Sequence, residues 1–160
     1  MARWRRIFLV AALAALPARL SAQTPESERA AVLATVHRLF DAMRSGDSAT
    51  ARSLFHPQAL LATAHLRGGA PVVQVDTLES FIHAVGAPRT EIWDERLGGA
   101  DVRIDGPLAS VWAEYAFYVG TELSHCGVDA LQLARSAGGW SIVAFTDTRR
   151  RTGCPGAGGR

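Results

Sequence analysis

Three residues whose side chains can carry chemistry lie close together in the last third of the chain: His125, Cys126 and Asp129. An imidazole, a thiol and a carboxylate in one short segment indicate either a nucleophilic site or the wall of a pocket. The flanking residues alternate in polarity, which predicts a β-strand. Neighbouring strand residues point to opposite faces, so His125 cannot activate the Cys126 thiol. His125 and Asp129 share a face, but their Cα atoms are about 13 Å apart, which excludes a direct dyad.

The other residues on this face depend on how the strand pairs with its neighbour. Gly120-Thr121 predicts a two-residue hairpin turn, which sets Val119 opposite Glu122. In this register, the face of His125 and Asp129 also carries Trp112, Glu114, Tyr118, Ile142 and Ala144, and the other face carries Val111, Ala113, Tyr115, Phe117, Val119, Val143 and Phe145. A slip of one residue would undo the assignment.

A face that mixes aromatic, acidic and imidazole groups with apolar ones is typical of a ligand pocket. We expect it to bind a small molecule through Trp112, Glu114, Tyr118, His125 and Asp129, with Trp93 at the rim. Two neighbouring carboxyl groups, Glu114 and Asp129, would raise the pKa of one of them. His125, Asp129 and Glu114 are therefore the candidates for a general acid or base. The alternative is that Glu114 pairs with an arginine or points to solvent.

The two cysteines and the N-terminus bear on the compartment. Residues 1–22 combine arginines, a short apolar run and small residues, which predicts a signal peptide, with an uncleaved membrane anchor as the alternative. We expect a periplasmic or secreted protein with one domain over residues 23–150 and a tail over 151–160. In an exported chain, Cys126 and Cys154 are expected to form a disulfide, since strand parity sends Cys126 to the outer face; two free thiols are the alternative.

Several function classes lack support in the sequence. The five histidines lack metal-ligand spacing, and no phosphate-binding glycine loop or dinucleotide motif is present, so we expect no metal and no cofactor. No basic face with interleaved aromatic residues predicts nucleic-acid binding. The run Arg149-Arg150-Arg151 is interpreted as a solvated strand end. No membrane association is expected after cleavage of the signal peptide.

The elements that must position these residues follow an α+β order, with helices first and strands after them. Thr24-Pro25-Glu26 begins a long helix with a buried apolar stripe, and Ser45-Gly46-Asp47 ends it. Asp47 begins a short second helix, and Asp76 to Glu79 is a capping box for a third. Strands are predicted over residues 59–64, 72–75, 91–97, 101–104, 109–119, 122–135 and 140–148.

Two segments resemble a known family. The run FDAMRSGDSATARSLFHPQALL is similar to the opening of nuclear transport factor 2-like proteins, and SHCGVDALQLARSAGGWSIVAFTDTRR is similar to the last hairpin of secreted SnoaL-like or lumazine-binding-like members. The resemblance implies a cone-shaped curved antiparallel sheet wrapped around a long N-terminal helix, a deep pocket and a possible homodimer through the sheet. The family includes ketosteroid isomerase, scytalone dehydratase, polyketide cyclases and non-catalytic members.

Fold alone does not assign a reaction. The catalytic tyrosine and aspartate of ketosteroid isomerase cannot be matched to residues of this sequence. His125 and Tyr118 are only loosely similar to the paired histidine and tyrosine of scytalone dehydratase. The first hypothesis is an exported domain that binds a small molecule. The second is a cofactor-free lyase or isomerase that uses a pocket histidine or carboxylate as its base. A purely structural dimer module is the third.

Overall fold

A computed structural model describes residues 24–154, so the predicted signal peptide and the end of the tail lie outside the described residues. The first helix, α1, spans Pro25–Ser45. The Thr24 side chain caps it by accepting a hydrogen bond from the Ser27 N–H at 3.2 Å. It ends at Gly46, whose φ of 73° is a left-handed conformation that glycine adopts without strain. Both ends of this helix were predicted.

Two shorter helices close one end of the molecule. Helix α2 spans Ser48–Ser53 and is capped by Asp47, and α3 spans Leu78–Gly86 and is capped by Thr77. The Arg89 guanidinium donates to the carbonyl oxygens of Val85, at 2.7 Å, and Met43. This one side chain therefore satisfies carbonyl groups at the ends of α3 and α1 and joins the two helices.

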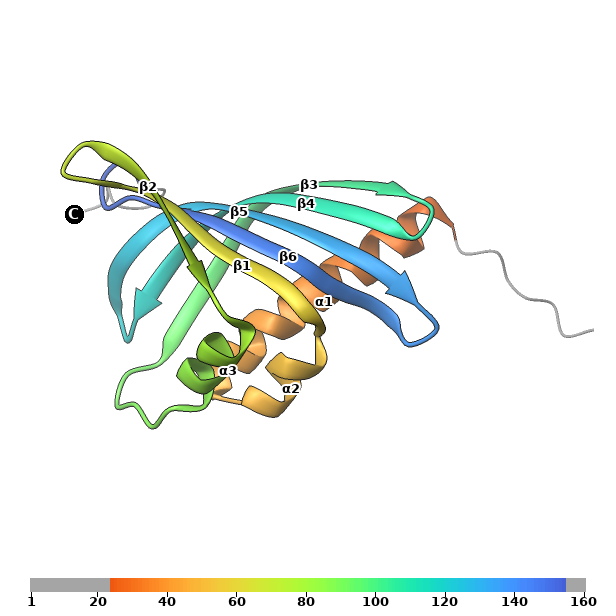
Figure 1. Ribbon diagram of the computed structural model, residues 1–160, viewed down its shortest axis with the longest axis horizontal. Helices are drawn as coiled ribbons and strands as arrows, with labels where there is room; N and C mark the ends of the chain where they lie inside the picture. Colours follow the sequence, from red (N-terminus) through yellow and green to blue (C-terminus); the bar gives the residue numbers. More distant parts are fainter. Residues whose placement is uncertain (1–23, 155–160) are drawn as a thin grey trace, which may run out of the picture.

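The sheet has six strands in the order β2-β1-β6-β5-β4-β3 (Figure 1). Every neighbouring pair is antiparallel except β1 with β6, which are parallel. The parallel pair differs from the expected antiparallel sheet. The strands are β1 Phe55–Arg67, β2 Ala70–Asp76, β3 Trp93–Asp105, β4 Leu108–Val119, β5 Glu122–Ser136 and β6 Gly139–Arg149.

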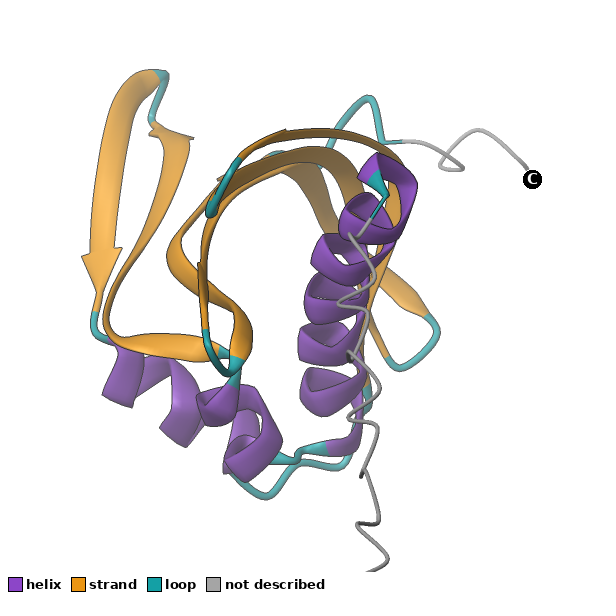
Figure 2. Ribbon diagram, turned by 90° about the vertical axis from the view of Figure 1, so that its right-hand side faces the viewer, coloured by secondary structure: helices purple, strands orange, loops and turns teal. Residues whose placement is uncertain are grey.

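The sheet curves around α1, which lies against its concave side (Figure 2). Apolar residues of α1, such as Val32, Val36 and Leu39, form one buried core with apolar residues of the sheet, among them Leu131 and Ile142. The residues predicted as two strands over 91–97 and 101–104 form one long strand, β3. Its register shifts between Leu97 and Ala100, where two glycines lie. The α+β fold with a curved sheet around a long helix is confirmed.

Two β-bulges change the predicted register. The hairpin turn at residues 120–121 is confirmed, but Tyr118 pairs with Leu123 and Phe117 with His125, which leaves Ser124 as an extra residue in β5. A second extra residue, Val143, lies in β6, because Leu133 pairs with Ile142 and Gln132 with Ala144. Beyond each extra residue, the side chains of that strand that would have shared a face with given residues of the neighbouring strand lie on the opposite face instead.

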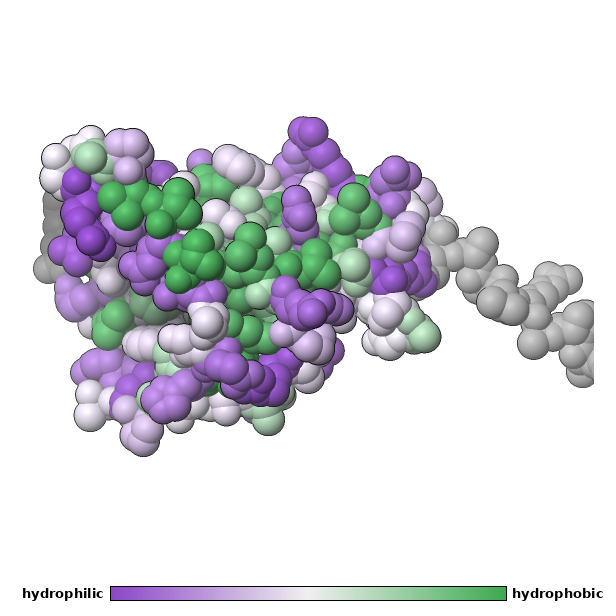
Figure 3. Space-filling model, viewed as in Figure 1, coloured by the Kyte–Doolittle hydropathy of each residue, from purple (hydrophilic) through white to green (hydrophobic). Residues whose placement is uncertain are grey.

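The predicted faces are therefore wrong for β4 and for most of β6. His125 and Asp129 share the concave face with Tyr115 and Phe117, and Phe145 joins them there. The convex face carries exposed apolar side chains, which Figure 3 shows gathered across the middle of the sheet. Those of Leu60, Val73, Val75, Leu108 and Trp112 are more than half exposed. A homodimer through the sheet stays a prediction.

Candidate functional site

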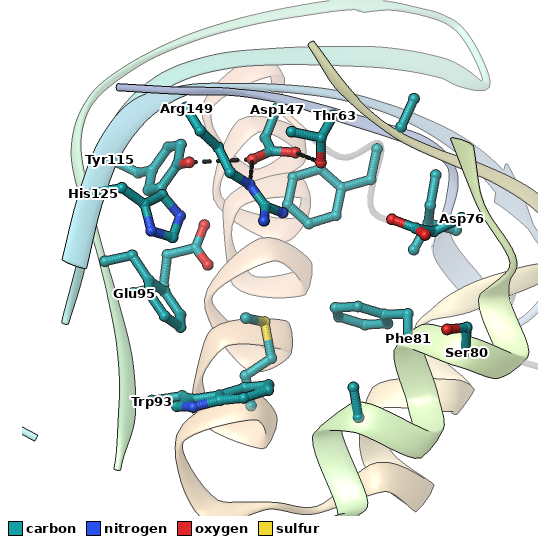
Figure 4. Close-up of a pocket in the computed structure, with 16 residues that line it drawn as sticks. Thr63, Asp76, Ser80, Phe81, Trp93, Glu95, Tyr115, His125, Asp147 and Arg149 are labelled. Carbon is teal, nitrogen blue, oxygen red and sulfur yellow. Dashed lines mark hydrogen bonds and ion pairs between the residues drawn. The ribbon is translucent and has the colours of Figure 1, made fainter. Parts of the chain in front are cut away.

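A cavity of about 350 Å³ lies between the concave face of the sheet and helices α1 and α3. Most of its polar side chains gather beneath the sheet, around Asp147, whereas Ser80 and Phe81 lie on α3 and Trp93 lies toward α1 (Figure 4). The apolar wall consists of Met43, Leu61, Ala62, Phe81, Ala84, Trp93, Phe117 and Phe145, and the polar lining consists of Thr63, Asp76, Ser80, Glu95, Tyr115, His125, Asp147 and Arg149. The cavity therefore offers an amphipathic environment.

The aromatic wall is a connected group rather than a set of isolated rings. Trp93 and Phe117 meet edge to face with ring centroids 6.0 Å apart, and Phe117 lies 5.0 Å from the His125 ring. Tyr115 meets His125 edge to face, with ring centroids 5.7 Å apart. Rings that pack on one another lose little freedom when a ligand binds, so this wall is preorganised for a flat partner.

Asp147 is the centre of the hydrogen-bond network at the polar end. Its Oδ1 accepts a hydrogen bond from the Thr63 hydroxyl at 2.6 Å, and its Oδ2 accepts one from Arg149 Nε at 2.6 Å. The Tyr115 hydroxyl lies 3.2 Å from Oδ2 and 2.9 Å from the Thr148 carbonyl oxygen, and it can donate its proton to either. Burial and the surrounding carboxylates raise the pKa of Tyr115, so its hydroxyl stays protonated and acts as a donor.

Two further carboxyl groups, Glu95 and Asp129, form a coupled pair at this end. Asp129 is 0% exposed, and neither of its carboxyl oxygens has a hydrogen-bond donor in residues 24–154. Burial, the charge of Glu95 and a hydrogen bond to Glu95 raise the pKa of Asp129 well above its usual value. Protonated Asp129 can donate to the Glu95 carboxylate, so a proton held between the two groups accounts for a carboxyl that otherwise has no partner.

Glu95 is the member of this pair that faces the cavity. Burial raises its pKa to about 7, with a hydrogen bond from Asp129 opposing the shift and the charge of Asp147 adding to it. A carboxyl group that exchanges its proton near neutral pH, at the surface of a cavity, has the properties of a general acid or base.

His125 lies beside this pair and lines the same cavity. Burial lowers the pKa of His125, and the positive charge of Arg149 lowers it further, so the imidazole is neutral near pH 7. The Ser124 hydroxyl lies 3.1 Å from His125 Nδ1. When Ser124 donates to Nδ1, the proton of the neutral ring lies on Nε2, which then serves as a hydrogen-bond donor.

The structure brings only some of the predicted site residues together. Trp93 and His125 line the cavity, and Asp129 lies buried behind Glu95. Trp112, Glu114 and Tyr118 do not line the cavity; they occupy the opposite face because of the bulge at Ser124. Trp112 is 60% exposed, and the Tyr118 ring packs under the Arg96 guanidinium. The expected pair of Glu114 with Asp129 is wrong, and the carboxyl that couples to Asp129 is Glu95.

Sequence reasoning missed Glu95, Tyr115, Asp147 and Arg149. Glu95 could have been found, because strand alternation places it on the same face as Trp93. Val111 and Ala113 form the apolar face of β4, and Leu131 and Leu133 form the apolar face of β5. These two faces lie on the same side of the sheet only if the pairing of β4 with β5 shifts by one residue from the pairing that the turn predicts. The same shift places Tyr115 on the concave face, so these apolar residues were the signal for Tyr115.

A disulfide joins Cys126 and Cys154 behind the cavity, on the other side of β5, with a Cα–Cα distance of 5.6 Å. This is the predicted bridge. Next to it, Gly127 lies so close to β6 that a Cβ atom at this position would be 1.7 Å from the Thr148 carbonyl oxygen and 2.8 Å from the Tyr115 ring. The absence of a side chain at Gly127 therefore lets Tyr115 and the end of β6 meet.

Neither a membrane span nor a metal centre is found in the described part of the chain. None of the helices in residues 24–154 has the length and apolar character needed to cross a membrane. Within the same residues, no group of three or more histidine, cysteine, aspartate or glutamate side chains is arranged to hold a metal ion.

Comparison with known proteins places this geometry in context. The sequence profile of a family described as "Putative lumazine-binding" matches residues 27–146. No curated protein matches the chain at a significant level. An NTF2-like protein with a cystatin-like fold from Novosphingobium aromaticivorans is 14% identical, with a TM-score of 0.65 over 79% of this chain and 84% of that chain.

Two other solved structures are similar. An NTF2-like protein of unknown function from Shewanella baltica is 15% identical, with a TM-score of 0.62 over 82% of this chain and 100% of that chain. A protein from Streptomyces avermitilis described as a "putative dehydratase from the NTF2-like family" is 18% identical, with a TM-score of 0.59 over 79% of this chain and 99% of that chain. At these identities the similarity establishes the fold.

Proposed function

Because the chain belongs to the family described as "Putative lumazine-binding" and has the NTF2-like fold, we propose that it binds a small, partly aromatic molecule in the cavity beneath the sheet. The observation that carries this proposal is the cavity of about 350 Å³ with an aromatic wall and a polar end. Trp93, Phe81 and Phe117 contact the apolar part of the ligand. His125 and Glu95 supply the polar contacts.

A cavity-filling substitution tests the binding proposal. Ala84 lines the cavity from α3, so Ala84→Trp places an indole where the ligand would lie. We expect the protein to bind the neutral fluorescent probe N-phenyl-1-naphthylamine, and Ala84→Trp to weaken that binding at least about tenfold, since loss of an apolar site of this size exceeds 1.4 kcal/mol. Fluorescence titration measures the affinity.

The matched control is Ala34→Trp, which adds the same side chain at an exposed position of α1. It should bind the probe as the parent does. If the parent does not bind the probe, or if both variants bind it equally well, the cavity is not the binding site.

A second candidate function is that of a cofactor-free lyase or isomerase, and the Glu95–Asp129 pair favours it. In this reaction Glu95 removes a proton from a carbon next to a carbonyl group of the substrate. The hydrogen bond from Asp129 opposes the effect of burial and keeps the pKa of Glu95 near neutral pH. The neutral His125 ring is the nearby donor for the oxygen on which negative charge develops.

Turnover of a β,γ-unsaturated ketone and of a β-hydroxy ketone tests this reading. We expect kcat/KM to rise with pH through about 7, where Glu95 loses its proton, and Glu95→Gln to lower kcat by roughly 10²-fold or more. Glu114→Gln, on the opposite face, should leave kcat unchanged. Absence of turnover in the parent, or equal activity in Glu95→Gln, would remove the enzymatic candidate and leave the binding proposal intact.

We also propose that the protein functions outside the cytoplasm, since disulfides persist in oxidising compartments. The disulfide between Cys126 and Cys154 supports this proposal. Protein recovered from the periplasm or medium should show, by intact mass under non-reducing conditions, the loss of residues 1–22 and two fewer hydrogens than the dithiol form. A full-length chain with two free thiols would contradict it.

A further inference from the structure

A second, more open pocket of about 660 Å³ adjoins the cavity at the end of β6. It shares Thr63, His125 and Arg149 with the cavity, so a single molecule can extend from one into the other. The rest of its lining consists of His65, Leu66, Gln74, Ser124, Arg150 and Arg151. We infer that this basic pocket binds an oxyanion, a carboxylate, sulfonate or phosphate group, that is carried by the molecule whose apolar part occupies the cavity. The inference rests on the proposed binding function.

The charge of the basic pocket supports an anionic partner. No aspartate or glutamate is among the residues that line it. Arg149 forms an ion pair with Asp147. Arg150 and Arg151 form no ion pair within residues 24–154, so two of the residues that line the pocket carry a positive charge without a carboxylate partner. The interpretation of this run as a solvated strand end is therefore incomplete: the side chains are exposed, but they line a pocket.

The backbone that carries these arginines is fixed in place. The Arg150 N–H donates to the Cys126 carbonyl oxygen and the Cys126 N–H donates to the Arg150 carbonyl oxygen, both at 2.9 Å. The disulfide holds Cys154 to Cys126 directly after this segment. Arginines on a fixed segment bind an oxyanion with a smaller loss of freedom than arginines on a free tail.

Guanidinium groups match the geometry of an oxyanion because their N–H donors lie in one plane and can form paired hydrogen bonds. The Gln74 amide lines the same pocket and can add a neutral hydrogen bond through the N–H that does not donate to Asp76. The two arginines are exposed to solvent, which weakens each contact, so we expect their joint effect on affinity to be about tenfold and to decline with salt.

Two fluorescent probes with one aromatic skeleton test the inference. N-phenyl-1-naphthylamine is neutral, and 8-anilinonaphthalene-1-sulfonate adds a sulfonate to the same rings. We expect the parent to bind the sulfonate probe about tenfold more tightly at low salt. Arg150→Gln with Arg151→Gln should remove this preference and leave the affinity for the neutral probe within about twofold. The double variant Arg38→Gln with Arg103→Gln removes the same charge at exposed sites outside both pockets and should keep the preference.

The possible outcomes separate this inference from the proposed function. Failure of the neutral probe to bind the parent overturns the proposed function. Binding of the neutral probe with no preference for the sulfonate, or a preference that Arg150→Gln with Arg151→Gln leaves intact, overturns the oxyanion site alone. If inorganic sulfate binds the parent in calorimetry but does not compete with the sulfonate probe, the two anions occupy different sites and the inference is wrong. Competition of sulfate with the sulfonate probe alone supports it.

Discussion

Replacing Gly127 by alanine is expected to lower the free energy of unfolding by about 3 kcal/mol or more. The new Cβ atom would lie 1.7 Å from the Thr148 carbonyl oxygen, a backbone atom that cannot rotate away, and 2.8 Å from the Tyr115 ring. The end of β6 must then move away from β5. That movement also separates the Tyr115 hydroxyl from Thr148 and Asp147.

The control for this substitution is Gly99→Ala in β3. A Cβ atom at Gly99 meets nothing within 4 Å, and its φ is not positive. Its unfolding free energy should be unchanged or rise by up to about 1 kcal/mol. Urea denaturation monitored by tryptophan fluorescence measures both variants. Equal stability of the two would show that the close approach of β5 and β6 at Gly127 does not constrain the fold.

Replacing Glu95 by glutamine is expected to make the protein more stable at pH 8 and to flatten its dependence on pH. The pKa of Glu95 is about 7 in the folded protein and 4.5 as the reference value, so the folded state binds more protons between these two pH values. The free energy of unfolding therefore falls as pH rises through this window. A shift of this size corresponds to roughly 3 kcal/mol, which Glu95→Gln should restore above pH 7.

Glu114→Gln serves as the matched control, because Glu114 is exposed on the convex face. It should follow the pH dependence of the parent. His125 acts in the opposite sense, since its lowered pKa makes the folded state gain stability as pH rises toward the usual histidine value. This contribution cancels in the difference between parent and Glu95→Gln. If the free energy of unfolding of the parent falls with pH no more steeply than that of Glu95→Gln, Glu95 titrates normally.

The fold could be predicted from the sequence, because its signals are local. Thr24 and Gly46 mark the ends of α1 through capping and left-handed geometry, and the turn at residues 120–121 sets the β4–β5 hairpin. The site could be predicted only in part. His125 and Trp93 line the cavity as expected, but the bulges at Ser124 and Val143 moved Tyr115, Asp147 and Arg149 onto the concave face.

A bulge has a weak sequence signal, because neither Ser124 nor Val143 is a glycine or proline that would demand a special conformation. One extra residue changes the facing of every later side chain while leaving the strand assignment unchanged. Element prediction can therefore be correct while the residues that line the site are wrong. The apolar faces of adjacent strands carry register information that the length of the turn alone does not.

The parallel pairing of β1 with β6 determines when during folding the site can form. Thr63 in β1 donates to Asp147 in β6 across a sequence separation of 84 residues. The β1–β2 hairpin is made early in synthesis, but its partner strand is among the last described residues to be made. Contacts between such distant segments form slowly, because a long loop must close first. We therefore expect the polar end of the cavity to be completed late in folding, and a bound molecule to slow the loss of β1 from the sheet rather than to speed the early steps of folding.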